Sequence, residues 1–431
     1  MALRAQCLSQ GYSGVNPKVV DSLLGFKNSG IIPTVRQYGS IGASGDLIPL
    51  ASIATALIGG NTDVFYQGKI LPAAKAISKA NLSKLSLSMR DGLALINGTS
   101  FMTAIASLGV FDLKRLFVQM LSTVAMALES LMVINCAYNP VVHQLKNQSG
   151  EIEVNEFLNH FWQGSQLLTD IDQLILLNKN DHNYRIQDYY SIRAVAQGFG
   201  PFIENLKMAE LWVENEINSV NDNPIIDASK KKILHNANFM GYYITDACDL
   251  LKMDIAQAST WLHALLANMV HPRKNNLLPT NLVSNPEIHN GFRPLQLLVA
   301  SIAVQNRKLG QSHQSYMLPT EGDNQDVNSL GTIAAFDLRE SVGNIEKIIS
   351  ILLVASVQAL EFRGIEKSSY KSQLVCKNIR KLFPAISAGR PLTNELETVI
   401  SALREGNIIL FLNKKNFYFR SYLLSGLPID G

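Results

Sequence analysis

Residues 39–50 read GSIGASGDLIPL, and the tripeptide Ala43-Ser44-Gly45 lies at their centre. When a chain bends sharply at Ala-Ser-Gly, the glycine nitrogen can reach the alanine carbonyl. Cyclisation with loss of two waters then gives an electrophilic methylidene-imidazolone ring. The reaction needs a small first residue, a serine to become the methylidene carbon, and a glycine that tolerates the strained approach. By itself the tripeptide is equally typical of an ordinary turn, so the surrounding sequence has to decide between the two.

Further stretches follow along the chain: DGLALINGTSFMTA at 91–104, QDYYSIR at 187–193, NSVNDNP at 218–224 and NQDVNSLG at 324–331. Together with the first stretch, and in this order, they resemble the motifs of the aromatic amino acid ammonia-lyases and aminomutases. The resemblance extends over most of the chain.

This resemblance implies a role for each motif. The methylidene-imidazolone would form autocatalytically from Ala43, Ser44 and Gly45, with no metal or diffusible cofactor. Asn97 would support the ring, and Tyr190 would be a catalytic tyrosine. The implied substrate-binding residues are Arg193, Asn223, Phe239, Glu321 and Gln325.

Residue type and spacing bear on some of these roles independently of the resemblance. Tyr190 and Arg193 are three residues apart and would share one face of a helix. A guanidinium presents two parallel donors, which suits a substrate carboxylate. Glu321 and Gln325 are four apart and would meet only if their segment is helical, which Gly322 disfavours.

Apolar residues recur with helical periodicity over 92–136, 192–220, 239–269, 295–311 and 327–362. This pattern predicts a mainly α fold with a helical bundle buried on several faces. A short strand pair is expected over 63–70, with Gln67-Gly68 as its turn. The resemblance implies the long central bundle of the fumarase and ammonia-lyase type. It also implies a homotetramer with active sites shared between subunits, a small N-terminal part at 1–90 carrying the prosthetic-group loop, and a bundle domain at 91–431.

Composition excludes several other classes of protein. The net charge is +3 and dispersed, which argues against nucleic acid. The four cysteines are far apart, and neither they nor His143 and His235 have the spacing of metal ligands. Widely spaced cysteines and an N-terminus without an apolar run predict a reduced, cytoplasmic protein. The apolar stretch at 348–362 contains Ser, Gln and Glu residues, which favours a buried helix over a membrane span.

The implied reaction removes ammonia from phenylalanine or tyrosine and gives an α,β-unsaturated acid. Histidine-type members usually carry a glutamate where this chain has the neutral Gln325, which favours the other two substrates. Three alternatives stay open: a histidine ammonia-lyase giving urocanate, an aromatic aminomutase, and an inactive truncated relative. The last arises because Met1 resembles a point downstream of the Gly-rich loop whose tyrosine is the family's β-proton base. Little lyase activity is expected of a chain without that loop.

Overall fold

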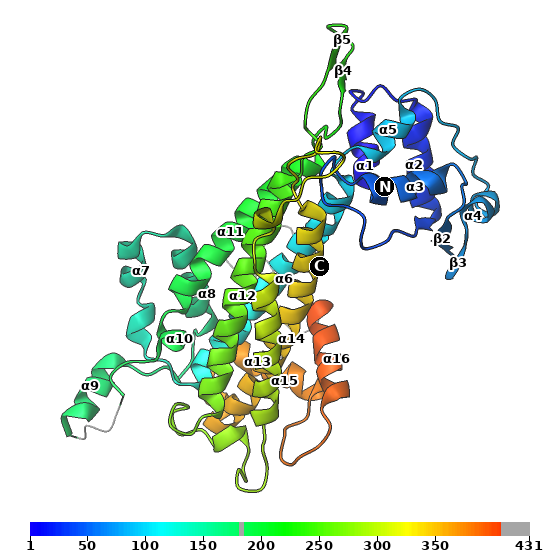
Figure 1. Cartoon of the computed structure of the whole chain (residues 1–431). Coiled ribbons are helices and arrows are strands. Elements are labelled where there is room, and N and C mark those ends of the chain that lie inside the picture. Colours follow the sequence, from blue (N-terminus) through cyan, green and yellow to red (C-terminus); the bar gives the residue numbers. More distant parts are fainter. Residues whose placement is uncertain (181–184, 407–431) are drawn as a thin grey trace. The chain divides into compact units, whose positions relative to one another are not determined.

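The computed structural model describes residues 1–180 and 185–406, and this part of the chain is mainly helical (Figure 1). It contains sixteen α-helices, α1 to α16, and five short strands, β1 to β5. The predicted mainly α fold is therefore confirmed. The predicted bundle domain at 91–431 extends beyond the described residues, which end at 406.

The chain divides into two compact units. Unit 1 comprises Met1–Val110, Met208–Leu250 and Gln311–Arg339, and unit 2 comprises Phe111–Lys207, Leu251–Gly310 and Glu340–Gly431. The division falls within the long helices α6 (Ser100–Ser130), α11 (Val195–Ile217), α12 (Tyr242–Val270) and α14 (Gly331–Arg363). Each unit is described by itself below.

Unit 1 begins with a small helical cluster around an apolar core. Its elements are α1 (Ala2–Ser9), α2 (Pro17–Ser29), α3 (Leu47–Leu57), α4 (Ala73–Lys79) and α5 (Asp91–Ile96). The start of α2 is set by Asn16, whose side chain accepts a hydrogen bond from Lys18 N, and by Pro17 in the first turn. Gly30, in the left-handed conformation, ends the helix. Leu23 and Phe26 of α2 then pack into the core with Leu57 of α3.

A three-stranded antiparallel sheet completes this cluster. Its order is β1 (Ile32–Pro33), β2 (Asp63–Tyr66) and β3 (Lys69–Pro72). Gln67 and Gly68 both have positive φ, as a two-residue hairpin turn requires. The predicted strand pair and its turn are therefore confirmed. A second hairpin of β4 (Ile225–Asp227) and β5 (Lys232–Leu234) also belongs to unit 1.

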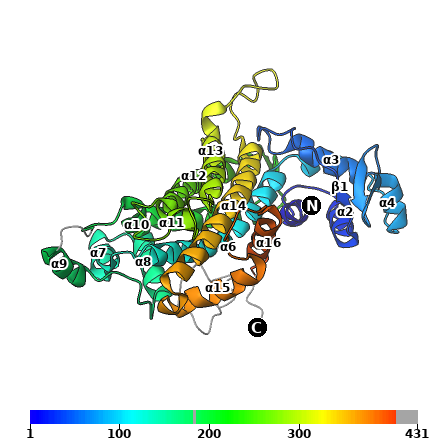
Figure 2. The same ribbon diagram turned by 90° about the horizontal axis from the view of Figure 1, so that it is seen from below.

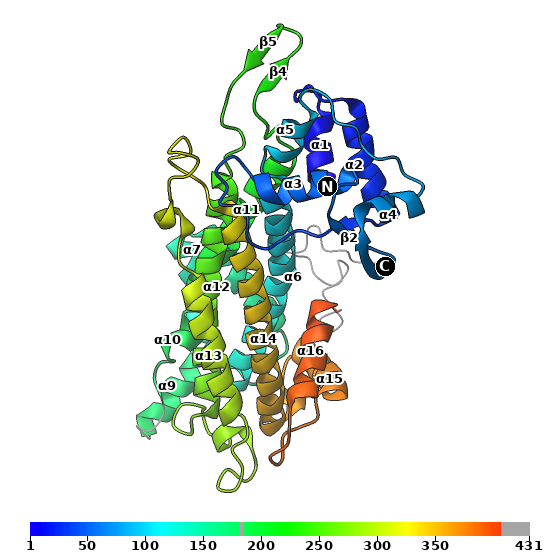
Figure 3. The ribbon, with the colours of Figure 1, turned by 45° about the vertical axis from the view of Figure 1, so that its right-hand side comes forward.

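Unit 2 is built on helices buried on all sides. Five consecutive α6 residues at 124–128 have exposed fractions of 0%, which is possible only where neighbours surround the helix. Residues 352–357 of α14 likewise have exposed fractions of 0%. Figures 2 and 3 show α12, α13 (Arg293–Leu309) and α14 alongside one another. The remaining helices of the unit are α7 (Pro140–Lys146), α8 (Ser149–Phe161), α9 (Ile171–Asn180), α10 (Tyr190–Arg193), α15 (Tyr370–Leu382) and α16 (Thr393–Arg404).

One predicted helix is interrupted. The periodic stretch at 92–136 forms α5 and α6 with a break at Asn97 and Gly98, where the backbone is extended at Asn97 (φ −93°, ψ 102°) and φ is +156° at Gly98. Apolar periodicity continues across the break, so the pattern did not reveal it. The break matters because it carries Asn97.

Among the helices of residues 1–180 and 185–406, none combines the length and the apolar character that a membrane span needs. No group of three or more His, Cys, Asp and Glu side chains in that part of the chain has an arrangement that holds a metal. All four cysteines are free thiols, and Cys136 alone among them is exposed.

Candidate active site

The loop that carries Ala43-Ser44-Gly45 is held by the late motif within unit 1. Leu330 N donates to Ile41 O at 2.8 Å, and Ser329 Oγ donates to Gly42 O at 3.1 Å. At Gly42 a Cβ atom would lie 2.2 Å from Ser329 Oγ, so this approach requires glycine. Two motifs far apart in the sequence therefore form one structure.

The bend at the tripeptide is packed against the break between α5 and α6. Gly45 has φ +69°, and a Cβ atom there would lie 2.2 Å from Gly98 O. Gly45 and Gly98 form an isolated parallel bridge, and Asp46 N donates to Gly98 O at 2.8 Å. Ala43 is buried and Ser44 is half-buried. The tripeptide is thus bent at Gly45 and packed against the backbone of Gly98.

Asp46, the residue after the tripeptide, was not singled out in the sequence. Its side chain is completely buried and accepts hydrogen bonds from Met102 N at 2.8 Å and Phe101 N at 3.1 Å, at the start of α6. Ser40 and Thr332 hydroxyls also donate to it. Burial raises the pKa of Asp46 to about 6, although these hydrogen bonds oppose the shift. The Asp46 carboxyl group therefore connects the loop to the start of α6, and its burial there is the reason for its raised pKa.

Replacing Asp46 with asparagine is expected to change how stability depends on pH. The pKa of this carboxyl is about 6 in the folded protein and 3.8 ordinarily. The folded state binds the proton more tightly, so this group's contribution to the free energy of unfolding falls as pH rises through that window. Relative to Asp46→Asn, wild type should lose up to about 3 kcal/mol between about pH 4 and pH 7. Urea unfolding at a series of pH values measures this, with the exposed Asp21→Asn as control. Parallel profiles for wild type and Asp46→Asn would contradict it.

Gln325 lies directly against the tripeptide. Its Nε2 donates to Ser44 Oγ at 2.8 Å, and its Oε1 accepts from Thr320 Oγ1 at 3.1 Å. The helix that would bring Glu321 and Gln325 together does not form. Residues 320–325 instead make a tight turn closed by backbone hydrogen bonds between Thr320 and Gln325, with φ +55° at Glu321. Glu321 is exposed, and the turn rather than helical spacing sets its position.

Asn97 and Asn223 lie close together in unit 1. Asn97 is 5% exposed, and its Oδ1 is buried without a hydrogen-bond partner among the described residues. Its Nδ2 lies 3.5 Å from Asn223 O, and Asn223 Oδ1 accepts from Asn236 N at 2.8 Å. Phe239 is half-buried and follows this segment just before α12. The buried Asn97 Oδ1 therefore has an acceptor position that no described residue uses.

Tyr190 and Arg193 belong to unit 2 and form a pair on the single-turn helix α10. The guanidinium carbon of Arg193 lies 4.8 Å from the centre of the Tyr190 ring. Trp261 Nε1 donates to Ser191 O at 2.8 Å and Tyr138 OH donates to Ile192 O, which holds the backbone of the turn. Tyr190 itself is 73% exposed. The backbone of α10 is thus fixed by hydrogen bonds, while the Tyr190 side chain is exposed.

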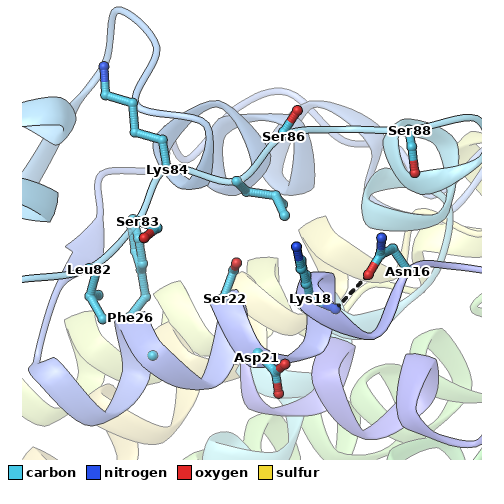
Figure 4. Close-up of a pocket in the computed structure, with 12 residues that line it drawn as sticks. Asn16, Lys18, Asp21, Ser22, Phe26, Leu82, Ser83, Lys84, Ser86 and Ser88 are labelled. Atoms are coloured by element: carbon cyan, nitrogen blue, oxygen red, sulfur yellow. Dashed lines mark hydrogen bonds between the residues drawn. The ribbon is translucent and has the colours of Figure 1, made fainter.

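Unit 1 also contains a groove that the sequence did not predict (Figure 4). It lies between α2 and the segment at 82–88, and the view shows Lys18 and Ser22 directed toward it. None of its lining residues is a predicted site residue. They are Asn16, Lys18, Asp21, Ser22, Gly25, Phe26, Leu82, Ser83, Lys84, Leu85, Ser86 and Ser88.

Residues 1–381 match the family model described as aromatic amino acid lyase, and the chain belongs to this family. It is 34% identical to the histidine ammonia-lyase of Geobacillus thermodenitrificans over 94% of this chain and 78% of that protein. It is 33% identical to tyrosine 2,3-aminomutase of Myxococcus fulvus, with 94% and 78% covered. The solved structure of Pantoea agglomerans phenylalanine aminomutase superposes with a TM-score of 0.90 at 30% identity, covering 94% of this chain and 79% of that one.

These similarities confirm the predicted family, its fold and the class of carbon–nitrogen lyases. They do not select phenylalanine or tyrosine as the substrate. Relatives named as histidine ammonia-lyases support histidine at least as well.

Proposed function

We propose that this protein removes ammonia from phenylalanine or tyrosine at a methylidene-imidazolone formed from Ala43, Ser44 and Gly45. The observation that carries the proposal is the bent tripeptide, with Gly45 packed on Gly98 and Ser44 Oγ 2.8 Å from the Gln325 amide. Family membership supplies the class of reaction.

The residues present fit this prosthetic group. The bend at Gly45 has no room for a Cβ atom, as the approach of its nitrogen to the Ala43 carbonyl requires. The buried Asn97 Oδ1 has a free acceptor position among the described residues. When present, a methylidene-imidazolone supplies an electrophilic carbon that no ordinary side chain offers.

The chain's own residues supply binding and orientation. Arg193 binds the substrate carboxylate through two parallel donors. Glu321 receives the substrate ammonium, and Phe239 contacts the ring. Tyr190 and Asn223 orient the substrate, while Asn97 supports the prosthetic group. Gln325 contributes a neutral amide next to Ser44, so it places no negative charge there.

We further propose a homotetramer in which the Tyr190 and Arg193 pair of one copy completes the site of another. The 73% exposure of Tyr190 suits a side chain that a second copy covers. Helix α13 also exposes apolar residues along one face, with Leu297 at 67% and Val304 at 54%. Analytical ultracentrifugation tests this assembly. Four free thiols suit the cytoplasm, which we propose as the location.

A histidine ammonia-lyase is the second candidate, favoured by 34% identity to a protein of that name. An aminomutase is the third, favoured by a TM-score of 0.90 to phenylalanine aminomutase. The neutral Gln325 beside Ser44 favours phenylalanine or tyrosine over histidine, because a glutamate there would interact with an imidazole.

The protein is expected to prefer phenylalanine or tyrosine to histidine. Replacing Gln325 with glutamate should shift kcat/KM toward histidine by about tenfold, since one charge contact is worth about 1.4 kcal/mol or more at a partly buried site. Steady-state assays with the three amino acids measure this preference. Chromatography of the products separates an unsaturated acid from a β-amino acid, and so a lyase from an aminomutase.

The matched control is Gln6→Glu, which adds the same charge to an exposed position of α1. A clear preference of wild type for histidine would overturn the interpretation of Gln325. A β-amino acid as the main product would favour the aminomutase.

A further inference from the structure

Arg4 is a charged residue in the interior of unit 1. It lies on α1 and is 1% exposed. Burial lowers the pKa of its guanidinium, which is the direction expected when a charge leaves water. A buried guanidinium destabilises the fold unless its N–H donors are paired. The acceptors of Arg4 therefore identify the parts of the chain that it connects.

The donors of Arg4 go mainly to the end of α5. Nε donates to Ala94 O at 2.8 Å, and Nη2 donates to Asn97 O at 2.7 Å. The last carbonyls of a helix have no partner within the helix, so an arginine at this end both pairs them and opposes the helix dipole. Nη1 donates to Asn221 Oδ1 at 3.1 Å. One side chain thus joins α1, the end of α5 and the segment before Asn223.

The carboxylate in this cluster is paired mainly with another arginine. Asp222 Oδ2 lies 2.7 Å from Arg90 Nη2, while Asp222 Oδ1 lies 3.6 Å from Arg4 Nη2. Arg90 Nε donates to Ser13 O, and Arg90 Nη2 also donates to Pro224 O. Arg4 and Arg90 therefore share Asp222, but only Arg4 has a described hydrogen bond to Asn97.

The contacts continue from Asn97 to the Ala-Ser-Gly loop. A Cβ atom on Gly98 would lie 2.3 Å from Arg4 Nη1, so the guanidinium is packed against this residue. Gly98 O in turn accepts from Asp46 N at 2.8 Å, and Gly98 forms the bridge to Gly45. Arg4 therefore contacts Gly98, and Gly98 contacts Gly45 of the tripeptide.

We infer that Arg4 is a positioning residue that holds Asn97 and Gly98 in the place where Asn97 faces the prosthetic group and Gly98 receives the bent loop. This inference rests on the proposed function. It predicts that a change at Arg4 impairs cyclisation of Ala43-Ser44-Gly45 and turnover, although Arg4 touches neither the tripeptide nor the substrate.

The experiment compares wild type, Arg4→Lys, Arg4→Gln and the matched control Arg90→Lys. Each is made by cell-free translation, so that the tripeptide starts uncyclised, and intact-mass spectra follow the loss of two waters with time. One ammonium nitrogen cannot serve all the acceptors that the three guanidinium nitrogens serve, so Arg4→Lys should cyclise at least about tenfold more slowly. Arg90→Lys disturbs the same Asp222 and should stay within about twofold of wild type. Urea unfolding and circular dichroism establish that each variant is folded.

A second readout separates positioning from general stability. After cyclisation is complete, Arg4→Lys should show kcat lowered by about tenfold or more with KM within about threefold, because a misplaced Asn97 affects the reacting atoms more than substrate binding.

The inference is overturned if Arg4→Lys cyclises and turns over like Arg90→Lys. It is also overturned if both Arg4 variants fail to fold while Arg90→Lys folds, because Arg4 would then be a stability residue. A folded wild type that never loses two waters contradicts the proposed function, and this inference, which rests on it, is then contradicted as well. Normal cyclisation in all variants contradicts only the role of Arg4.

Discussion

Replacing Ser44 with alanine is expected to abolish the loss of two waters and to lower kcat by at least about 10³-fold. Without the serine hydroxyl, no methylidene carbon can form, although Gly45 nitrogen can still approach the Ala43 carbonyl. The fold should survive, because Ser44 is half-buried and its Oγ contact is with the Gln325 amide. Intact mass and steady-state assays on the folded protein measure the two effects.

The control for this substitution is Ser52→Ala, the same change on α3, where the hydroxyl only donates to Ile48 O. That variant should keep both the mass deficit and the activity. A folded wild-type chain with an unmodified tripeptide would refute the proposed prosthetic group. Full activity in Ser44→Ala would show that the reaction proceeds without it.

Much of the fold follows from local patterns in the sequence. Periodic apolar residues at 239–269, 295–311 and 327–362 correspond to α12, α13 and α14. Turn residues at Gln67 and Gly68 located the β2–β3 hairpin. Each of these features is specified by residues close together in the chain, which is why periodicity and turn chemistry find them.

The contacts that assemble the candidate site could not be predicted in the same way. Arg4 hydrogen-bonds to residues 90 and 217 positions away, and a single arginine in an eight-residue helix gives no sign of burial. Asp46 is inconspicuous for the same reason, since its donors come from the start of α6. Only the position of Asp46 next to Ala-Ser-Gly could have directed attention to it.

Spacing alone does not show whether two residues meet, because it depends on the backbone conformation between them. Glu321 and Gln325 have helical spacing, yet positive φ values at Glu321, Gly322 and Asp323 make this segment a turn. Tyr190 and Arg193, three apart on α10, do share contact because that turn is helical. The same kind of spacing therefore brings one pair together and not the other, and the difference depends on glycine and its neighbours, as Gly322 indicated.

Replacing Gly45 with alanine is expected to have the largest effect on stability among single methyl additions to the loop. An L-residue at φ +69° costs about 1–2 kcal/mol. In addition, the new Cβ atom would lie 2.2 Å from Gly98 O, which is backbone and cannot rotate away. Crowding of this kind costs about 1–3 kcal/mol more. The free energy of unfolding should therefore fall by about 2–5 kcal/mol in total.

Gly68→Ala separates the two causes, because Gly68 has φ +77° and a Cβ atom there would have no neighbour within 4 Å. This control should lose only the conformational cost of about 1–2 kcal/mol. Gly45→Ala should also fail to lose two waters, since relief of the clash with Gly98 moves the loop away from the geometry that cyclisation needs. Urea unfolding and intact mass measure both effects. If Gly45→Ala were no less stable than Gly68→Ala and cyclised normally, the docking of Gly45 on Gly98 would not be what shapes the tripeptide.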